Sequence, residues 1–262
     1  SLVLFGGILS GVLGPGIALL TKDWVEGAPF MGSYQSLIGL YILIFLLLQL
    51  VDLPKPAASE QQPRTRPFWE ITRQTSWKVS ILSAALGYAA MSLVMTATPL
   101  SMQAHHHSFS TSAFVIQWHI IAMFLPSFFT GNIIQCFGSK NIMLVGIGLN
   151  LLCILINTQG QFFVFYWSAL ILLGVGWNFM FIAGTTLLTE TYRPEEKALV
   201  QGVNDVLVFG SAASGSLLAG VLQNHIGWES LNTVLAPPLL LLAGWLLWLK
   251  RKKRILVQQP LQ

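Results

Sequence analysis

Residues 52–77 read DLPKPAASEQQPRTRPFWEITRQTSW and divide the chain into two long apolar runs before them and six after them. Four prolines and several polar residues make this stretch typical of a linker and argue against a packed domain there. Each run is close to the roughly 20 residues that a helix needs to cross about 30 Å of hydrocarbon. The eight runs are 1–21, 30–51, 78–101, 112–136, 141–158, 162–189, 198–223 and 231–249.

The composition places these runs in a membrane. Hydrophobic residues make up 54% of the 262 residues and charged residues only 9%, whereas a soluble domain carries about 25% charged residues. So few charges cannot cover a surface that faces water, so lipid must cover most of it. Because backbone polar groups cannot stay unpaired in lipid, the runs must be helices. The sequence predicts an all-α, polytopic transmembrane helix bundle with about eight spans.

The basic residues indicate how this bundle is oriented. If residues 52–77 are cytoplasmic and the runs alternate from there, thirteen of the 14 Lys and Arg residues lie inside and only Lys22 lies outside. Cytoplasmic loops of membrane proteins carry this excess of Lys and Arg. We expect a multi-pass protein of the plasma membrane with both chain ends in the cytoplasm. The basic loops form no groove suited to nucleic acid, so no nucleic-acid partner is expected.

The sequence contains no catalytic set. It has no HExxH, GxSxG or P-loop pattern, and no acidic pair within one run that could hold a metal. The adjacent histidines His105, His106 and His107 stand without an acid or cysteine nearby, so a zinc site is not expected there. Two cysteines do not make a disulfide framework. We expect no enzyme activity, no cofactor and no metal, and the sequence indicates no obligate protein partner.

The first run contains the glycine-rich stretch GGILSGVLGPGIALL. Its residues Gly7, Gly11 and Gly14 fall near one helical face, where small side chains let another helix approach closely. Pro15 removes one backbone hydrogen bond and bends the helix. Two interpretations stay open: plain helix packing, and a hinge or seal at a transport interface.

Two ionisable side chains within the runs are candidates for proton coupling. Asp205 lies about seven positions into run 198–223 and beside Asn204. A charge within a membrane is costly and marks a functional position, although a structural hydrogen bond near a helix end would also explain it. His119 lies at a comparable depth in run 112–136, where it could titrate near neutral pH or be a packed histidine.

A second group of candidates consists of polar and aromatic side chains, most of them near the membrane midpoint. A polar amide at that depth must face protein or water and not lipid. Such residues could line a solute cavity, or could only join helices by hydrogen bonds worth about 0.6 kcal/mol each. We favour the cavity because several of them converge on one depth. The substrate-binding candidates are Trp177, Asn178, Tyr88, Asn150 and Trp118.

The connection GNIIQCFGSKNI follows the fourth run and predicts a tight turn. Gly131 and Gly138 flank it, and glycine tolerates the positive φ that such a turn can need. Lys140 would anchor the turn on the cytoplasmic side. Pro126, earlier in the same run, is expected to kink the helix.

The connection TETYRPEEKALVQG precedes the seventh run. Pro194 and the two acids after it are typical of the start of a helix. Glu190 and Arg193 could form an ion pair across this turn. A structural role is the favoured interpretation of the whole segment.

The number and order of these features resemble the major facilitator superfamily, over essentially the whole chain. That family has twelve helices in two six-helix halves joined by a long cytoplasmic loop. If residues 52–77 are that loop, the first two runs match the fifth and sixth helices and the last six match the C-terminal half. The chain begins at Ser1 inside an apolar run, without Met or a basic region, so we expect a fragment that lacks the first four helices.

Three local matches carry this resemblance. The run from Ser10 to Ala18 resembles the glycine-proline motif of the fifth helix, which that family associates with proton-coupled export. The turn Gly131 to Lys140 resembles the G-x-x-x-D-R-x-G-R-K signature. Its acid and two arginines are replaced here, by Gln135, Cys136 and Ser139. The segment Pro194 to Lys197, with Gln201 and Asp205, is similar to the segment that joins the tenth and eleventh helices.

The resemblance implies alternating access, in which two half-bundles rock around a central site. We therefore expect a secondary transporter, coupled to protons, that exports a small organic solute. Its partners would be the solute, protons and membrane lipid. The gating residues implied by the motifs are Gly11, Gly14, Pro15, Gly131, Gly138 and Lys140.

The expected domain organisation follows from the same resemblance. Residues 1–51 would end the N-terminal half-bundle, 52–77 would be the cytoplasmic linker, 78–249 the C-terminal half-bundle and 250–262 a basic cytoplasmic tail. Two alternatives stay open. One is an integral membrane enzyme that uses Asp205 or His119 on a lipid-like substrate, and the other is a truncated fragment that does not transport.

Overall fold

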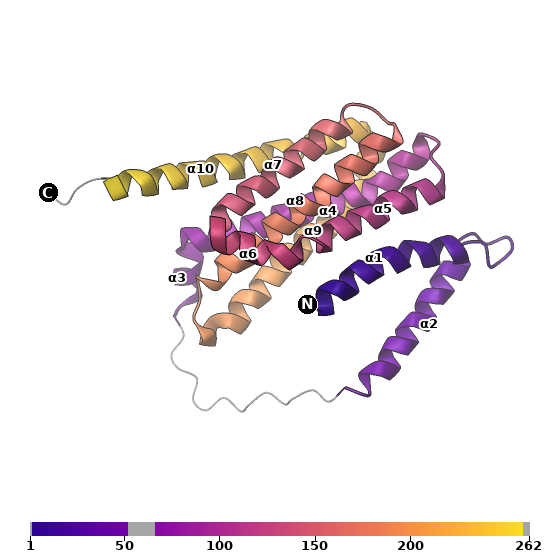
Figure 1. Ribbon diagram of the computed structural model, residues 1–262, viewed down its shortest axis with the longest axis horizontal. Helices are drawn as coiled ribbons and strands as arrows, with labels where there is room; N and C mark the ends of the chain where they lie inside the picture. Colours follow the sequence, from indigo (N-terminus) through magenta and orange to yellow (C-terminus); the bar gives the residue numbers. More distant parts are fainter. Residues whose placement is uncertain (1, 52–65, 259–262) are drawn as a thin grey trace.

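The computed structural model describes residues 2–51 and 66–258, which form helices joined by short connections (Figure 1). The all-α prediction is confirmed. The elements are α1 (Leu2–Thr21), α2 (Met31–Leu48), α3 (Phe68–Arg73), α4 (Thr75–Ala104), α5 (Phe109–Phe124), α6 (Ser127–Phe137), α7 (Ser139–Asn157), α8 (Phe163–Thr189), the 3-10 turn η1 (Pro194–Glu196), α9 (Lys197–Thr233) and α10 (Ala236–Gln258).

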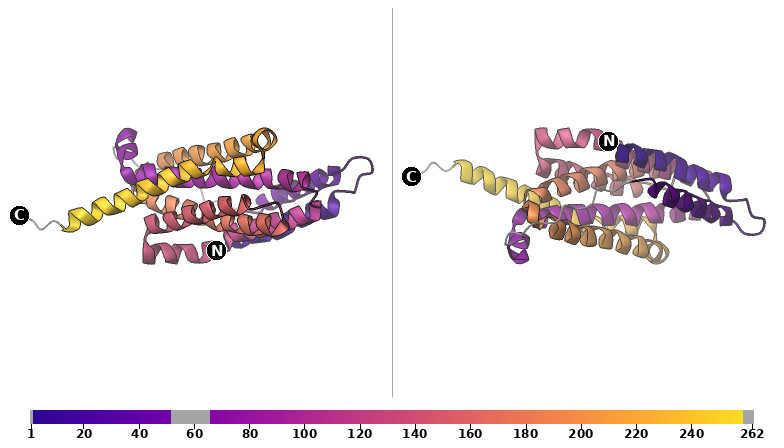
Figure 2. Two further views of the ribbon diagram at one scale, coloured as in Figure 1. Left: turned by 90° about the horizontal axis from the view of Figure 1, so that it is seen from above. Right: turned by 90° about the horizontal axis from the view of Figure 1, so that it is seen from below.

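Helices α4 to α10 form a bundle, called here the C-terminal bundle, with α4 and α8 at its centre. α4 packs against α8 and α9, and α8 also packs against α5 and α7 (Figure 2). Small residues allow the close approach: a Cβ on Gly184 would lie 3.0 Å from the backbone oxygen of Ser80, and one on Gly174 would lie 2.7 Å from that of His119. Close van der Waals packing of this kind holds helices together in lipid.

The fourth predicted run is broken near its middle. α5 ends at Phe124, α6 begins at Ser127, and the two helices are bent by 42°. Pro126 lies in the break, and because it has no N–H group the helix loses one hydrogen bond there. The predicted kink at Pro126 is confirmed.

The last two predicted runs follow each other closely. The apolar segment Pro194–Lys252 has 59 residues, and a continuous helix of that length would extend roughly 90 Å, about three times the thickness of the hydrocarbon core. The chain turns at Gly227, whose φ of 77° and ψ of 174° are not helical. The segment therefore divides into two helical parts, which correspond to runs 198–223 and 231–249.

By length and composition, five helical segments in the described part of the chain could cross a membrane, and six if the bent pair α5–α6 counts as one span. This number treats Pro194–Lys252 as a single segment and leaves out the shorter apolar helix Gly6–Thr21. Each of the eight predicted runs nevertheless coincides with helix in the structure.

The connections between helices gather at two ends of the C-terminal bundle. At one end Phe137, Glu190 and Lys250 surround a common pocket, so the α6–α7 turn lies beside the end of α8 and beside Lys250 in the interior of α10. We call this the basic end. At the opposite end His105 and Gln161 line another pocket. This separation agrees with the alternation of loops expected from the distribution of Lys and Arg.

The α1–α2 hairpin attaches to the C-terminal bundle at α5 (Figure 1). A Cβ on Gly7 would lie 2.8 Å from the ring of Phe124, and one on Gly11 would lie 2.6 Å from Ile120. These two glycines therefore allow the close helix approach that their spacing predicted. Gly14 has no atom within 4 Å of an added Cβ and takes no part in this contact.

The structure corrects part of the predicted linker 52–77. Residues 52–65 lie outside the described part, but α3 occupies Phe68–Arg73 and α4 begins already at Thr75. Ile71 of α3 is fully buried, in a cluster with side chains of α4, α8 and α9. The second half of the stretch is therefore packed helix, because a short apolar face within it finds a partner surface on the bundle.

Candidate functional site

Four aromatic side chains from three helices meet on one side of the C-terminal bundle. We call Tyr88, Trp177, Phe181 and Phe209 the aromatic cluster. The ring of Tyr88 lies edge-on to the other three, with centroid distances of 5.1 Å to Trp177, 5.0 Å to Phe181 and 5.6 Å to Phe209. Trp177 and Phe181 stack at 5.4 Å. These are the separations of favourable aromatic pairs.

Small residues of α4 bring the aromatic cluster together. Gly87 precedes Tyr88, and a Cβ on Gly87 would lie 3.2 Å from the Cβ of Met180 in α8. One turn earlier, the Ser83 hydroxyl donates a hydrogen bond to the Met180 carbonyl at 3.0 Å. Because α4 and α8 approach so closely, Tyr88 reaches the two aromatic rings of α8.

Trp177 is the most buried member of the aromatic cluster. Its side chain is 5% exposed and packs with Met91 and Met123. The indole Nε1–H is buried and has no hydrogen-bond partner among the described residues. A buried donor without a partner is destabilising by about 1–3 kcal/mol.

α9 brings Asp205 to the aromatic cluster. Asp205 lies one helical turn before Phe209, so the two side chains share a face. The carboxylate accepts a hydrogen bond from the Asn204 amide at 3.2 Å. Asp205 is exposed and forms no ion pair within residues 2–51 and 66–258. The predicted coupling residue thus lies one helical turn before Phe209, whose ring packs against Tyr88.

Asn178 of α8 faces the break that separates α5 from α6. Its Nδ2 donates to the Met123 carbonyl at 2.7 Å and to the Ser127 hydroxyl, and its Oδ1 accepts from the Thr130 hydroxyl at 2.7 Å. Both the nitrogen and the oxygen of this buried amide are therefore hydrogen-bonded to protein groups. The geometry favours the helix-joining interpretation of Asn178 over a place in a cavity wall.

Asn150 joins α7 to α8. Its Nδ2 donates to the Gly146 carbonyl at 2.9 Å and lies 3.3 Å from the sulfur of Met180. A Cβ on Gly176 would collide with this amide, so the glycine of α8 makes room for it. Asn150 is buried, and this placement also favours helix packing.

His119 and Trp118 are neighbours in sequence but lie in different surroundings. His119 is fully buried at the contact between α5 and α8, with its Nδ1 2.7 Å from the Leu170 carbonyl and its Nε2 without a partner. Trp118 is exposed and lies edge-on to Trp167 at 6.0 Å. Neither belongs to the aromatic cluster.

The predicted turn between α6 and α7 forms at Gly138. This residue has φ of 80° and ψ of 146°, a conformation that residues with a Cβ rarely adopt. Gly131 lies within α6, and nothing lies within 4 Å of a Cβ added there. Lys140 lies in the first turn of α7 and lines the pocket at the basic end.

Pro15 lies inside α1, where it interrupts the backbone hydrogen bonds. The side chain of Gln117 in α5 donates to the carbonyl of Val12, three residues before Pro15, at 3.0 Å. The interrupted part of α1 is thus bound to the C-terminal bundle by a polar contact as well as by the glycine contacts.

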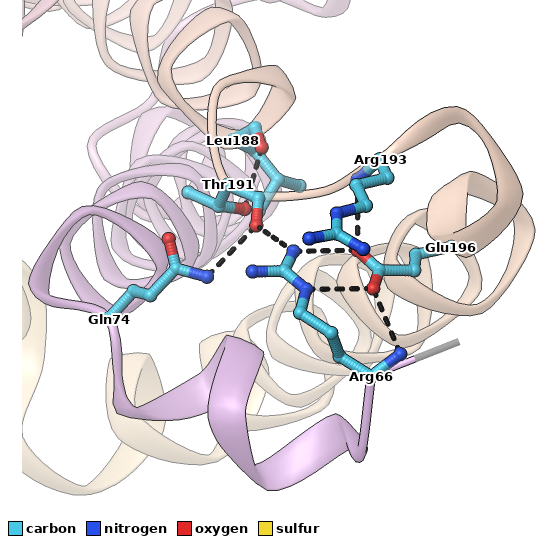
Figure 3. Close-up of polar contacts among 6 residues, drawn as sticks. All are labelled: Arg66, Gln74, Leu188, Thr191, Arg193 and Glu196. Carbon is cyan, nitrogen blue, oxygen red and sulfur yellow. Dashed lines mark hydrogen bonds and ion pairs between the residues drawn. The ribbon is translucent and has the colours of Figure 1, made fainter. Parts of the chain in front are cut away.

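A polar network holds the residues before α3 on the α8–α9 connection (Figure 3). Arg66 donates from Nε and Nη2 to the two carboxylate oxygens of Glu196, at 2.9 and 2.7 Å. Arg66 and Gln74 both donate to the carbonyl of Thr191, at 3.3 and 2.9 Å. The backbone N–H of Arg193 donates to Glu196 at 2.9 Å.

Glu196 ends the 3-10 turn η1, before α9 and outside the predicted run 198–223. Its side chain is only 2% exposed. The Arg66 side chain, supported by the backbone N–H of Arg193, lowers the pKa of this carboxyl from 4.5 to about 2. Glu196 is therefore ionised at any physiological pH, because hydrogen bonds and an opposite charge favour the charged form.

Nothing in the sequence marked the Arg66–Glu196 pair. The ion pair predicted between Glu190 and Arg193 is wrong: Arg193 contributes its backbone N–H, and Glu190 forms no ion pair in the described part of the chain. Arg66 and Glu196 are 130 residues apart, so local spacing could not connect them. The clue in the sequence was Glu196 itself, an acid in the first turn of a helix.

The three adjacent histidines turn toward different groups. His105 Nδ1 lies 2.7 Å from the Ser101 carbonyl, and His107 Nε2 lies 2.8 Å from the Gln161 carbonyl. Among the residues that the structure describes, no three His, Cys, Asp or Glu side chains are placed to hold a metal ion. The rings contribute to local structure at the end opposite the basic end.

A comparison with protein families identifies the fold. The model of the Major Facilitator Superfamily matches residues 80–259, which is more than half of the chain. The chain belongs to the major facilitator superfamily. It is accordingly a multi-pass membrane protein, and the resemblance found in its motifs is confirmed. The match covers nearly all of the C-terminal bundle, including all four residues of the aromatic cluster.

Several relatives share this major facilitator fold. The riboflavin transporter RfnT of Brucella anthropi is 37% identical, over 90% of this chain and 60% of its own length. The uncharacterized MFS-type transporter YddS of Bacillus subtilis is 30% identical, over 96% of this chain and 62% of its own. The tetracenomycin C resistance and export protein of Streptomyces glaucescens is 25% identical over 60% of this chain and 30% of its own. The chain thus spans about three fifths of the length of RfnT and YddS.

Proposed function

We propose that this protein is a secondary transporter that exports a small organic solute by alternating access, coupled to protons. Membership of the major facilitator superfamily and the relatives named as transporters support the class. The single observation that carries the proposal is the aromatic cluster together with the buried indole N–H of Trp177, which has no hydrogen-bond partner in the described part of the chain. This group of residues offers both a stacking surface and a hydrogen-bond donor to a solute.

The aromatic cluster suits a planar aromatic solute. Offset stacking or edge contact with aromatic rings is worth about 0.5–1.5 kcal/mol beyond the buried area. Phe209 is 58% exposed and offers part of its ring to such a contact. Riboflavin, the solute in the name of RfnT, has a planar heteroaromatic ring with oxygen and nitrogen acceptors. It is therefore the first solute to test.

Asp205 is the residue that we assign to proton coupling. An unpaired carboxylate beside the solute surface can take up a proton in one half of a transport cycle and release it in the other. His119 was the second candidate for this role. Its enclosure between α5 and α8, with Nδ1 at the Leu170 carbonyl, leads us to assign it to helix packing.

The solute assignment is tested with Trp177→Ala in the full-length gene product. Loss of the indole N–H and of the stacked ring should weaken the apparent affinity for riboflavin about tenfold, measured from the concentration dependence of flux in membrane vesicles. Trp69→Ala, at an exposed tryptophan of α3, is the matched control and should leave the affinity unchanged. Unchanged affinity of Trp177→Ala for every transported compound would remove the aromatic cluster as the binding site.

The coupling assignment is tested with Asp205→Asn. This variant should insert into the membrane and bind solute, but flux driven by a pH gradient should be lost, because the amide cannot carry the proton. Asp23→Asn, in the exposed α1–α2 connection, controls for the loss of one carboxylate. If pH-driven flux of Asp205→Asn equals that of the unsubstituted protein, Asp205 has no part in coupling.

A further inference from the structure

A pocket of about 430 Å³ opens at the basic end of the C-terminal bundle. It lies where the α6–α7 turn meets the start of α4, the end of α8 and the Leu249–Lys250 part of α10, and thus on the side of the bundle away from the histidine-lined end. Two lysines from different helices line it, Lys140 of α7 and Lys250 of α10. The aromatic cluster contributes no residue to this pocket, so its ligand is not the transported solute.

The lining of the pocket carries a net positive charge. Lys140 forms no ion pair among the described residues, and Lys250 is bound only to a neutral partner, the side-chain oxygen of Asn141 at 2.5 Å. Glu190 also lines the pocket and likewise has no ion pair in the described part of the chain. Two ammonium groups therefore share the space with one carboxylate. An anion would bind to the two lysines, and a hydroxyl group on the same ligand would donate a hydrogen bond to Glu190.

The backbone strengthens the preference for an anion. The positive φ of Gly138 breaks the helix, so α7 begins inside the pocket lining at Ser139, and no side chain caps its N-terminus. The first N–H groups of a 19-residue helix attract negative charge. Ser76 of α4 adds a hydroxyl group to the lining.

The surroundings of the pocket are those of a membrane surface. Phe137, which lines the pocket, is 64% exposed, and Leu247 and Trp248, which precede the pocket residues Leu249 and Lys250 in α10, are exposed. Lys252 lies over the ring of Trp248 at 5.5 Å. Exposed apolar rings next to lysines are typical of the boundary between acyl chains and headgroups. A ligand here can thus have a charged head in the pocket and apolar chains against α10.

We propose that this pocket binds the headgroup of an anionic phospholipid, with the phosphate diester between Lys140, Lys250 and the N-terminus of α7. A glycerol headgroup such as that of phosphatidylglycerol has the hydroxyl groups that Glu190 can accept from. The lipid would join the α6–α7 turn to α10, two elements between which Lys250 and Asn141 make the polar contact. Basic pockets between helices on the cytoplasmic side are known to suit such headgroups.

The test uses the purified full-length gene product in a neutral detergent and follows its thermal unfolding as lipid is added. Phosphatidylglycerol should raise the unfolding temperature, and phosphatidylcholine at the same concentration should not. In Lys140→Gln/Lys250→Gln the concentration of phosphatidylglycerol at half effect should rise about tenfold or more, because each lysine near a membrane anion contributes about 1 kcal/mol. Lys140→Arg/Lys250→Arg should restore the effect.

The matched control is Lys78→Gln/Lys197→Gln, which removes two exposed lysines that do not line the pocket. It should respond to phosphatidylglycerol like the unsubstituted protein. Equal responses of the two double glutamine variants would overturn the proposal, as would equal stabilisation by phosphatidylglycerol and phosphatidylcholine. Inorganic phosphate is the last ligand to test. If it stabilises the protein as much as the lipid does, the pocket binds free anions and the lipid assignment is wrong.

Discussion

α2 and α8 are both long apolar helices, but they differ in what surrounds them. In their membrane-spanning windows, 6% of α2 is buried against protein and 56% of α8. α8 carries Gly174, Gly176 and Gly184, each closely approached by a neighbouring helix, whereas nothing lies within 4 Å of a Cβ added to Gly39 of α2. Apolar composition thus identifies a membrane helix, while small residues identify the faces that meet protein.

The strongest test of this comparison is Gly174→Val. A Cβ at this position would lie 2.7 Å from the His119 oxygen and 3.0 Å from the Met123 nitrogen, and these backbone atoms cannot move without displacing α5. We expect the free energy of unfolding to fall by about 1–3 kcal/mol or more, measured by thermal unfolding in detergent. Gly39→Val in α2 and Gly148→Val in α7, which both have open space, should have little effect.

A second test concerns the polar contacts that Asn178 makes within the bundle. Asn178→Ala leaves the Met123 carbonyl and two hydroxyl groups at the α5–α6 break without their partner. We expect a loss of about 1–2 kcal/mol in unfolding free energy. Asn132→Ala, at an exposed position of α6, is the control. Equal stability of the two variants would mean that Asn178 does not hold the break.

A third test addresses acid stability at the basic end. The folded pKa of Glu196 is about 2 and its ordinary value is 4.5. The stabilisation from this carboxylate is therefore complete above about pH 4.5 and is lost as pH falls toward 2. Glu196→Gln should be less stable than the unsubstituted protein at neutral pH, and the difference should shrink as pH falls through this window. Hydrogen exchange of α3 is the local measurement.

Glu195→Gln serves as the control for this pH dependence. Glu195 is exposed and forms no ion pair in the described part of the chain, so its variant should follow the unsubstituted protein at every pH. A parallel pH dependence in the unsubstituted protein and in Glu196→Gln would show that the Arg66 contact contributes nothing to folding.

The smallest effect on stability is expected where the hairpin meets the bundle. Gly11→Leu should push α1 away from Ile120, and should leave the unfolding temperature of the bundle unchanged because the contacts among α4 to α10 are kept. Cysteines introduced at positions 7 and 124, in a background with Cys136→Ser, should cross-link several-fold more slowly in this variant. Gly14→Leu has open space and should cross-link at the original rate; equal rates in both would contradict the close contact.

The elements that depend on local sequence could be predicted. The apolar runs located the helices, Pro126 located the break, and Gly138 located a turn that needs a positive φ. α3 was missed because its six residues are too short to show a period, and its apolar face matters only against α4, α8 and α9.

The candidate site could be predicted only in part. Depth in the membrane grouped Tyr88, Trp177, Asn178 and Asn150, but depth does not tell which face of the bundle a side chain meets. Packing distinguishes them. Tyr88 and Trp177 lie in the aromatic cluster, whereas the amides of Asn178 and Asn150 lie at helix contacts. Asp205 joined the rings only because α9 packs along α4, which no spacing within α9 reveals.

The Arg66–Glu196 pair also decides where this protein can be divided into two pieces. The third apolar run begins at residue 78, which would suggest dividing the chain near Trp77. A split there leaves Arg66 and α3 on one piece and Glu196, a buried carboxylate without its cation, on the other. A second piece that begins at or before Arg66 keeps the pair intact. Co-expression of two halves, or insertion of a reporter domain between them, should therefore place the junction ahead of Arg66.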